Sequence, residues 1–163
     1  MSVLFFYFWL MEIQKYMKDP VTINSNKSYK DAVQLMTDSR SNALMVVDDA
    51  GKLLGGIDIV TLIKVAIPEY LKGDKEATHI ASHFVPDNLF DTYIHDVQDT
   101  PIKDFYFEYS KVVTPKSSVT EAAIKATEGR QSKIPVVDED GKPLGILTRG
   151  CIRKIIASEL GIQ

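Results

Sequence analysis

The feature that most constrains this chain is an internal repeat with an offset of 90 residues. Val46-Val47-Asp48 recurs as Val136-Val137-Asp138, and Gly51-Lys52 recurs as Gly141-Lys142. Identity at many spaced positions in one ungapped register predicts two copies of one structural unit, roughly residues 21–67 and 111–157. The other matched pairs are Leu54 and Leu144, Gly55 and Gly145, Ser28 and Ser118, Ala32 and Ala122, Thr37 and Thr127, Arg40 and Arg130, and Lys64 and Lys154.

Each copy shows the same order of predicted elements: strand, helix, strand, strand, helix. The first helix begins with a capping box, Ser28-x-x-Asp31 or Ser118-x-x-Glu121, whose side-chain oxygens satisfy free amides of the first turn. Two apolar strands joined by a tight turn follow, and the last helix begins near the N-cap residues Asp58 or Thr148. The predicted strands cover residues 21–23, 43–47 and 53–57 in the first copy, and 111–113, 134–137 and 144–147 in the second.

A unit this small cannot bury both faces of its own sheet, so the two copies are expected to share a core. The fold class is therefore α/β, more strictly α+β, with two pseudo-symmetric repeats packed sheet to sheet. We divide the chain into an apolar N-terminal extension (1–11), a first repeat (12–67), an inserted and mostly helical segment (68–110) and a second repeat (111–163).

Composition narrows the functional classes. With 19 basic and 22 acidic side chains the chain carries a net charge of −3, which argues against a protein that coats nucleic acid. The single cysteine allows no internal disulfide and no zinc-binding spacing, so we expect a cytoplasmic protein. Residues 1–11 are too short for a membrane span and lack signal-peptide features. They either precede a natural start at Met11 or form an apolar contact with a second copy or a membrane surface.

The order of elements, with the Val-Val-Asp, Asp-Gly-Lys and Leu-Gly residues, resembles the cystathionine beta-synthase (CBS) domain. Two such units in tandem resemble a CBS pair, or Bateman module, and the likeness is most specific at residues 134–138 and 145–148. The resemblance implies a disc-like dimer and clefts that bind adenosine-containing ligands such as AMP, ADP, ATP or S-adenosylmethionine. It also implies a regulatory protein that is not an enzyme and requires no cofactor.

The resemblance also implies a set of ligand-binding residues. In the family a Gly-h-h-Thr/Ser-x-x-Asp motif, where h is apolar, places a hydroxyl and helix amides at a phosphate and an Asp at the ribose. In this chain Gly145 and Thr148 match the phosphate-binding part of the motif, but Cys151 replaces the Asp that binds the ribose. The implied residues are Val113, Thr114, Arg130, Lys133, Ile134, Pro135, Gly145, Thr148, Arg149 and Cys151, with a weaker equivalent site at Ile23, Asp58 and Thr61.

Charge favours the second copy for an anionic ligand. Residues 111–163 carry nine basic and six acidic side chains, and Arg130, Lys133 and Arg149 would converge on a phosphate. In the first copy Asp58 would repel one. The alternative is that these cations are ordinary surface charges, and that Ile134 and Pro135 belong to the core instead of an adenine slot.

The middle segment is too apolar for a flexible tether, and we expect helices at 79–84 and 87–97 that cover one end of the module or contact a partner. His79 and His83 stand one helical turn apart and would hold a metal ion with His95 or Asp96, but histidines at this spacing are more often surface residues, so no metal site is expected. The sequence shows no catalytic set.

Two functions remain open at this point. One is a regulatory module that senses an adenosine-type ligand and signals to an unidentified partner protein. The other is a structural dimerisation or docking module whose clefts bind nothing, as the missing ribose carboxylates would suggest. In both cases we expect a homodimer, without nucleic acid or a membrane span, formed through apolar faces of the last helices at Leu62, Ile63, Val65, Ile152, Ile155 and Ile156.

Overall fold

The structure is a computed structural model that describes residues 12–69, 72, 89–128 and 133–162. In these residues the elements follow the order predicted for two repeats. They are α2 (Glu12–Tyr16), β1 (Thr22–Asn24), α3 (Tyr29–Ser39), β2 (Ala43–Val47), β3 (Leu53–Asp58), α4 (Ile59–Ala66), α6 (Leu89–Val97), the 3-10 helix η2 (Ile102–Asp104), α7 (Val119–Thr127), β4 (Lys133–Val137), β5 (Pro143–Thr148) and α8 (Arg149–Glu159).

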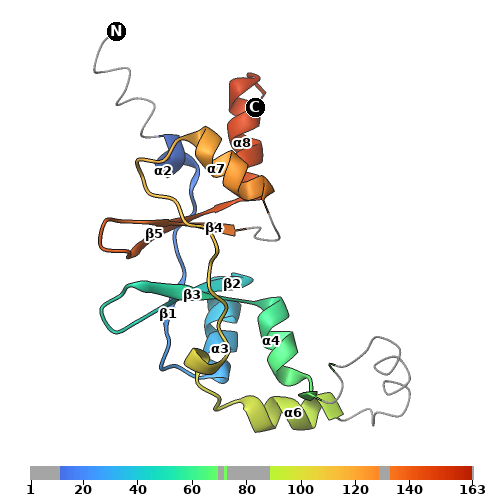
Figure 1. The fold of residues 1–163 in the computed structure, drawn as a ribbon. Helices are drawn as coiled ribbons and strands as arrows, with labels where there is room; N and C mark the ends of the chain where they lie inside the picture. The colour runs from blue at the N-terminus through green and yellow to red at the C-terminus, as the bar shows by residue number, and fades with distance from the viewer. Residues whose placement is uncertain (1–11, 70–71, 73–88, 129–132, 163) are drawn as a thin grey trace.

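Two small sheets face one another in the middle of the molecule, with helices on the outer side of each (Figure 1). In the first sheet β1 pairs with β2 in parallel, and β2 pairs with β3 in antiparallel orientation. In the second sheet β4 and β5 form the equivalent antiparallel pair. The first strand predicted for the second copy is reduced to one parallel bridge between Val113 and Val136. The predicted fold class is confirmed.

Each sheet buries residues on both of its faces. Successive side chains of a strand point to opposite faces, and one set packs under the helices: Leu44, Val46 and Ile57 in the first repeat, and Ile134, Val136 and Leu147 in the second. Met45 and Pro135, which are equivalent in the repeat, are fully buried but belong to neither helix-covered cluster. They therefore lie in the layer between the two sheets, which we call the repeat junction.

The helix cap predicted from the sequence is complete in the first copy. Ser28 Oγ accepts a hydrogen bond from the Asp31 amide and the Asp31 carboxylate accepts one from the Ser28 amide, which completes the capping box. In the second copy Ser118 caps the Glu121 amide, while the Glu121 carboxylate pairs with Lys125 at 2.7 Å.

The tight turns of the two copies touch each other. Gly51 and Gly141 close these turns with φ near 80°, a conformation that glycine adopts without strain. The Leu53 amide donates to the Gly141 carbonyl at 2.9 Å, so the two repeats are hydrogen-bonded to one another at this end of the junction.

The segments that precede the two repeats cross over. Residues 12–18 were assigned to the first repeat (12–67), but they lie before its first strand and pack on the second repeat: Ile13 is buried in the second core, and Lys18 pairs with Ile146 beside β5. Residues 102–107 precede the second repeat, but Ile102 is buried in the first core and Phe107 pairs with Gly56 beside β3. Each sheet is thus extended at one edge by the segment that leads into the other repeat.

Glycines admit these crossing segments. A Cβ atom at Gly55 would lie 2.1 Å from the Phe107 carbonyl oxygen, and one at Gly145 would lie 2.5 Å from Met17 Sδ. The repeated Leu-Gly dipeptide of the sequence therefore marks the positions where a neighbouring segment packs directly on the strand.

Helix α6 of the middle segment lies at the outer end of the first repeat. There α6 contacts α4, and Ile94 and Val97 pack against the first core (Figure 1). His79, His83 and the helix expected at 79–84 lie outside the described residues. Within the described ranges, no group of three or more potential ligands is placed to hold a metal ion. The same ranges contain no helix that is long and apolar enough to span a membrane.

Candidate ligand site at the repeat junction

The last helix of each repeat begins at the junction with a different capping residue. Asp58 caps α4, and its Oδ1 accepts hydrogen bonds from the Thr61 amide and the Thr61 hydroxyl, both at 2.8 Å. Thr148 caps α8, and its Oγ accepts from the Cys151 amide at 3.3 Å and lies 3.2 Å from Cys151 Sγ. The equivalent positions therefore carry a carboxylate in the first repeat and a neutral hydroxyl in the second.

Strand register brings two lysines to the same face as Thr148. Directly paired residues of neighbouring strands project to the same side of a sheet. Lys133 of β4 pairs with Thr148, and Lys18 pairs with Ile146, which is two residues from Thr148 and so shares its face. This is also the face of Pro135, and it points towards the first sheet. Lys18, Lys133 and Thr148 form what we call the second junction site, with Arg149 exposed beside them at the start of α8.

Lys18 was not predicted from the sequence, because it lies outside the repeat that it completes. Its pairing with Ile146, through two main-chain hydrogen bonds of 3.0 and 2.9 Å, is what places Lys18 at the second junction site. The usable signal in the sequence was the glycine at 145, which indicates that some segment packs on β5 without identifying which one.

The electrostatic environment of Lys133 links the two repeats. Partial burial lowers the pKa of the Lys133 ammonium group, nearby Asp58 of the first repeat opposes that shift, and nearby Lys18 adds to it. Two lysine side chains thus lie close enough to repel each other at the second junction site. Positive charge held together in this way favours an anionic ligand.

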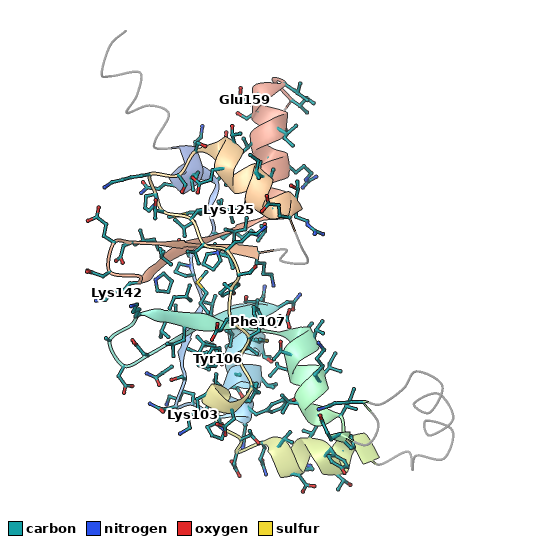
Figure 2. The ribbon with its side chains drawn as sticks, viewed as in Figure 1. Lys103, Tyr106, Phe107, Lys125, Lys142 and Glu159 are labelled. Carbon is teal, nitrogen blue, oxygen red and sulfur yellow. The ribbon has the colours of Figure 1, made fainter. Side chains whose placement is uncertain are left out.

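The equivalent part of the first repeat, which we call the first junction site, is filled with aromatic side chains. Phe107, which is labelled in Figure 2, pairs with Gly56 as Lys18 pairs with Ile146. The Phe107 and Tyr109 rings meet edge to face with centroids 5.2 Å apart. The Tyr109 hydroxyl is buried without a hydrogen-bond partner among the described residues. Burial, and secondarily the charge of Asp58, raise the pKa of Tyr109 to about 12.

Several of the residues implied by the resemblance lie inside the cores. Val113, Ile134 and Cys151 belong to the buried second cluster, and Ile23 belongs to the first. Cys151 is 2% exposed and contributes no carboxylate to the junction. Gly145 is covered by Met17, while Thr114 and Arg149 are exposed. Arg130 lies outside the described residues. The assignment of these residues to a ligand site remains a prediction.

The helix faces expected to form a dimer are only partly available. Leu62 and Ile155 are buried in their own repeats, so the expectation that they meet a second copy is wrong: they point inwards from their helices. Val65 and Ile152 pack partly against the same cores. The exposed apolar residues are Ile59, Val60 and Ile63 on α4 and Ile156 and Leu160 at α8.

Comparison with known proteins gives a consistent family match. The CBS domain matches residues 12–67 and 97–158. The chain is 27% identical over 130 residues to the chloroplastic CBS domain-containing protein CBSX2 of Arabidopsis thaliana, covering 78% of this chain and 55% of that protein. It is also 27% identical over 141 residues to the choline transport ATP-binding protein OpuBA of Bacillus subtilis, covering 86% of this chain and 29% of the relative. The chain thus spans about half or less of these two proteins.

Solved structures share the fold. CBSX2 from Arabidopsis thaliana superposes with a TM-score of 0.70 at 22% identity, covering 91% of this chain and 96% of that chain. A complex of CBSX2 with AMP gives a TM-score of 0.64 at 21% identity, covering 90% and 96%. The CBS domain pair of protein MJ0100, in complex with 5-methylthioadenosine and S-adenosyl-L-methionine, gives 0.63 at 22% identity, covering 90% and 96%.

Proposed function

Because this chain belongs to the CBS domain family, we propose that it is a non-catalytic regulatory module that binds an adenosine-type ligand at the second junction site. Structural relatives bind ligands of this class: CBSX2 binds AMP, and the MJ0100 domain pair binds 5-methylthioadenosine and S-adenosyl-L-methionine. The observation that carries the proposal is the convergence of Lys18, Lys133 and the Thr148-capped start of α8 on one face of the second sheet.

The proposed binding mode follows from the chemistry of these groups. A phosphate is held by Thr148, the free amides of the first turn of α8 and the neighbouring cations, since the N-terminal end of a helix attracts negative charge. Pro135, which lies on the same face as Thr148, borders the base, whereas the Ile134 side chain points into the helix-covered core. Because Cys151 is buried and uncharged, the ribose hydroxyls lack a carboxylate partner, and the affinity for AMP is expected to be weak.

The contrast between the two sites suggests one ligand per chain. Asp58 repels a phosphate at the first site, and Phe107 and Tyr109 already fill the space next to Gly56. A base would have to displace these rings from their packed positions. We therefore place the ligand at the second repeat and treat the first site as self-occupied.

The regulatory part of the proposal requires a partner. The exposed apolar residues Ile59, Val60 and Ile63 on α4 provide a surface for a second copy, which would make the module a homodimer. A ligand would change the geometry of the repeat junction, and an effector protein bound to the dimer would respond to that change. Light scattering at tens of micromolar protein, an ordinary concentration for such contacts, should give a dimer; a monomer would refute this element.

Thermal melts against a nucleotide panel separate this function from the alternative of a purely structural module. A ligand at about 100 times its dissociation constant adds about 2.7 kcal/mol to the free energy of unfolding. For a chain of this size this corresponds to a rise in Tm of roughly 5–10 °C. We expect such a rise with AMP, ADP, ATP or S-adenosylmethionine. No rise with any of them would favour a docking module with an unused ligand site, as the absence of a ribose carboxylate in both repeats suggests.

A further inference from the structure

We propose that an exposed apolar surface at the end of the second repeat is a docking surface for residues 1–11 of the same chain. This surface, which we call the α8 face, consists of Ile156, Leu160 and Ile162, whose side chains are 55%, 68% and 60% exposed. Residues 1–11 lie outside the described residues, and their sequence is almost wholly apolar, with no charged side chain. Packing the segment on the α8 face removes both apolar surfaces from water.

The equivalent place in the first repeat is covered by a helix. Ile156 corresponds to Ala66 at the repeat offset of 90, and Ala66 is only 1% exposed. It belongs to the first core, against which Ile94 and Val97 of α6 pack, and α6 contacts α4 (Figure 1). In the second repeat the main described contacts of α8 are with β5 and α2, and these leave Ile156 exposed. The part of the chain that the structure describes therefore holds no counterpart of α6 there.

The two crossing segments are equivalent to one another, in a register that identifies this counterpart. Ile102 and Ile13 are each buried in the core of the other repeat, and each carbonyl accepts a hydrogen bond from the amide four residues later, at 3.1 and 3.0 Å. The side chains of those two later residues cover equivalent glycines, and the next residues pair with equivalent strand positions. The corresponding pairs, each at an offset of 89 residues, are Ile102 with Ile13, Tyr106 with Met17, and Phe107 with Lys18.

The same offset relates α6 to the beginning of the sequence. Apart from its first residue, α6 corresponds to residues 1–8. The two α6 side chains that pack against the first core, Ile94 and Val97, correspond to Phe5 and Phe8. Large apolar side chains therefore stand at both positions that a covering segment uses for contact. We infer that Phe5 and Phe8 pack on the second repeat as Ile94 and Val97 pack on the first.

The chain enters beside the α8 face. Residues 1–11 are followed directly by α2, which contacts α8. Eleven extended residues span about 36–40 Å, whereas α8, with 11 residues, is about 16 Å long. The segment is therefore long enough to reach the whole face. Because it is tethered there, its effective concentration is on the order of millimolar, which favours it over a second copy or a membrane surface.

Tryptophan fluorescence tests the docking, because Trp9 is the only tryptophan of the chain and directly follows Phe8. In the unaltered protein the Trp9 emission should be blue-shifted relative to the urea-unfolded chain and protected from acrylamide, and dilution should change neither property. The α8-face variant, Ile156→Gln with Leu160→Gln, should move both properties towards those of the unfolded chain. Val33→Gln is the matched control, because Val33 is a 40% exposed apolar residue on α3 of the first repeat. It should leave Trp9 unchanged.

The other occupants give different results. A Trp9 that is exposed in dilute protein overturns the proposal. If it then becomes buried only at concentrations where light scattering reports a larger assembly, the segment binds a second copy. If it becomes buried only with vesicles of phosphatidylcholine and phosphatidylserine, the segment binds a membrane surface. A buried Trp9 that does not respond to the α8-face variant also overturns the proposal, because the segment then packs elsewhere.

A double-mutant cycle tests the register. Phe5→Ala with Phe8→Ala should destabilise the protein in urea, and the loss should be much smaller in the α8-face variant, since residues in contact are not additive. Phe6→Ala with Tyr7→Ala is the control, because these residues correspond to residues 95–96 of α6, which are exposed. Its effect should be the same in both backgrounds. Additive losses for Phe5 and Phe8, or equal coupling for both pairs, would overturn the proposed register.

Discussion

The two repeats share a backbone design but differ in what fills the junction beside them. At the first site the crossing segment brings Phe107 and, two residues later, Tyr109 to the face of Asp58. At the second site the crossing segment brings Lys18 to the face of Thr148 and Lys133. Phe107 and Lys18 occupy equivalent positions, so the difference is made by segments outside the repeats. A symmetric scaffold thus carries one apolar, self-filled site and one cationic site.

The largest expected effect compares the two glycines that admit the crossing segments. Gly55→Ala places a Cβ atom 2.1 Å from the Phe107 carbonyl oxygen, which is main chain and cannot move aside. It should cost about 3 kcal/mol, the upper range for overpacking. Gly145→Ala meets the flexible Met17 side chain at 2.5 Å and should cost about 1 kcal/mol. Urea denaturation of both variants checks the order, and a Gly145→Ala cost as large as that of Gly55→Ala would contradict it.

Two tyrosines, the buried Tyr29 and the half-buried Tyr109, should respond differently to loss of the hydroxyl. Tyr29 donates to the Leu62 carbonyl at 3.2 Å, so Tyr29→Phe should lose about 1 kcal/mol of stability. The Tyr109 hydroxyl is buried without a partner among the described residues, so Tyr109→Phe should be neutral or should stabilise by about 1 kcal/mol. Equilibrium unfolding measures both. A clear loss in Tyr109→Phe would show that this hydroxyl has a partner, and that the first site is more polar than we describe.

A smaller effect should appear at alkaline pH. The pKa of Tyr109 is about 12 in the folded protein, above its ordinary value, so the folded state keeps a proton that the unfolded chain loses. The free energy of unfolding should therefore fall as pH rises above about 10, by roughly 1 kcal/mol at pH 11 from this group. Tyr109→Phe should lose less stability over the same range. Parallel pH profiles for the two proteins would mean that Tyr109 is not held in a buried environment.

The sequence predicted the scaffold well because its signals are local. The offset of 90 residues, the Ser28 capping box and the Asp58 and Thr148 caps are each read from a few neighbouring residues, and the structure confirms them. The helix faces were predicted less well. Leu62 and Ile155 were expected at a dimer surface, but an apolar stripe alone does not distinguish the side that faces the core of the same chain.

The junction sites could not be predicted to the same degree, because they depend on contacts between distant segments. Lys18 joins Lys133 only through pairing with Ile146, and Tyr109 approaches Asp58 only because residues 102–107 cross to the first sheet. Gly145 in the sequence indicated that another segment of the chain packs on this strand. It carried no information on which segment would arrive, or on the charge that this segment would bring.

The central claim, that the second junction site binds the ligand and the first does not, is tested most directly by calorimetric titration of AMP into matched variants. Asp58→Ala and Thr148→Val each remove the capping side chain of one last helix, and Thr148→Val is combined with Arg149→Ala. We predict one site per chain in the unaltered protein and in Asp58→Ala, with affinity equal within about twofold, and a loss of roughly tenfold to a hundredfold in the double variant. Unchanged affinity in the double variant, or lost binding in Asp58→Ala, would contradict the assignment.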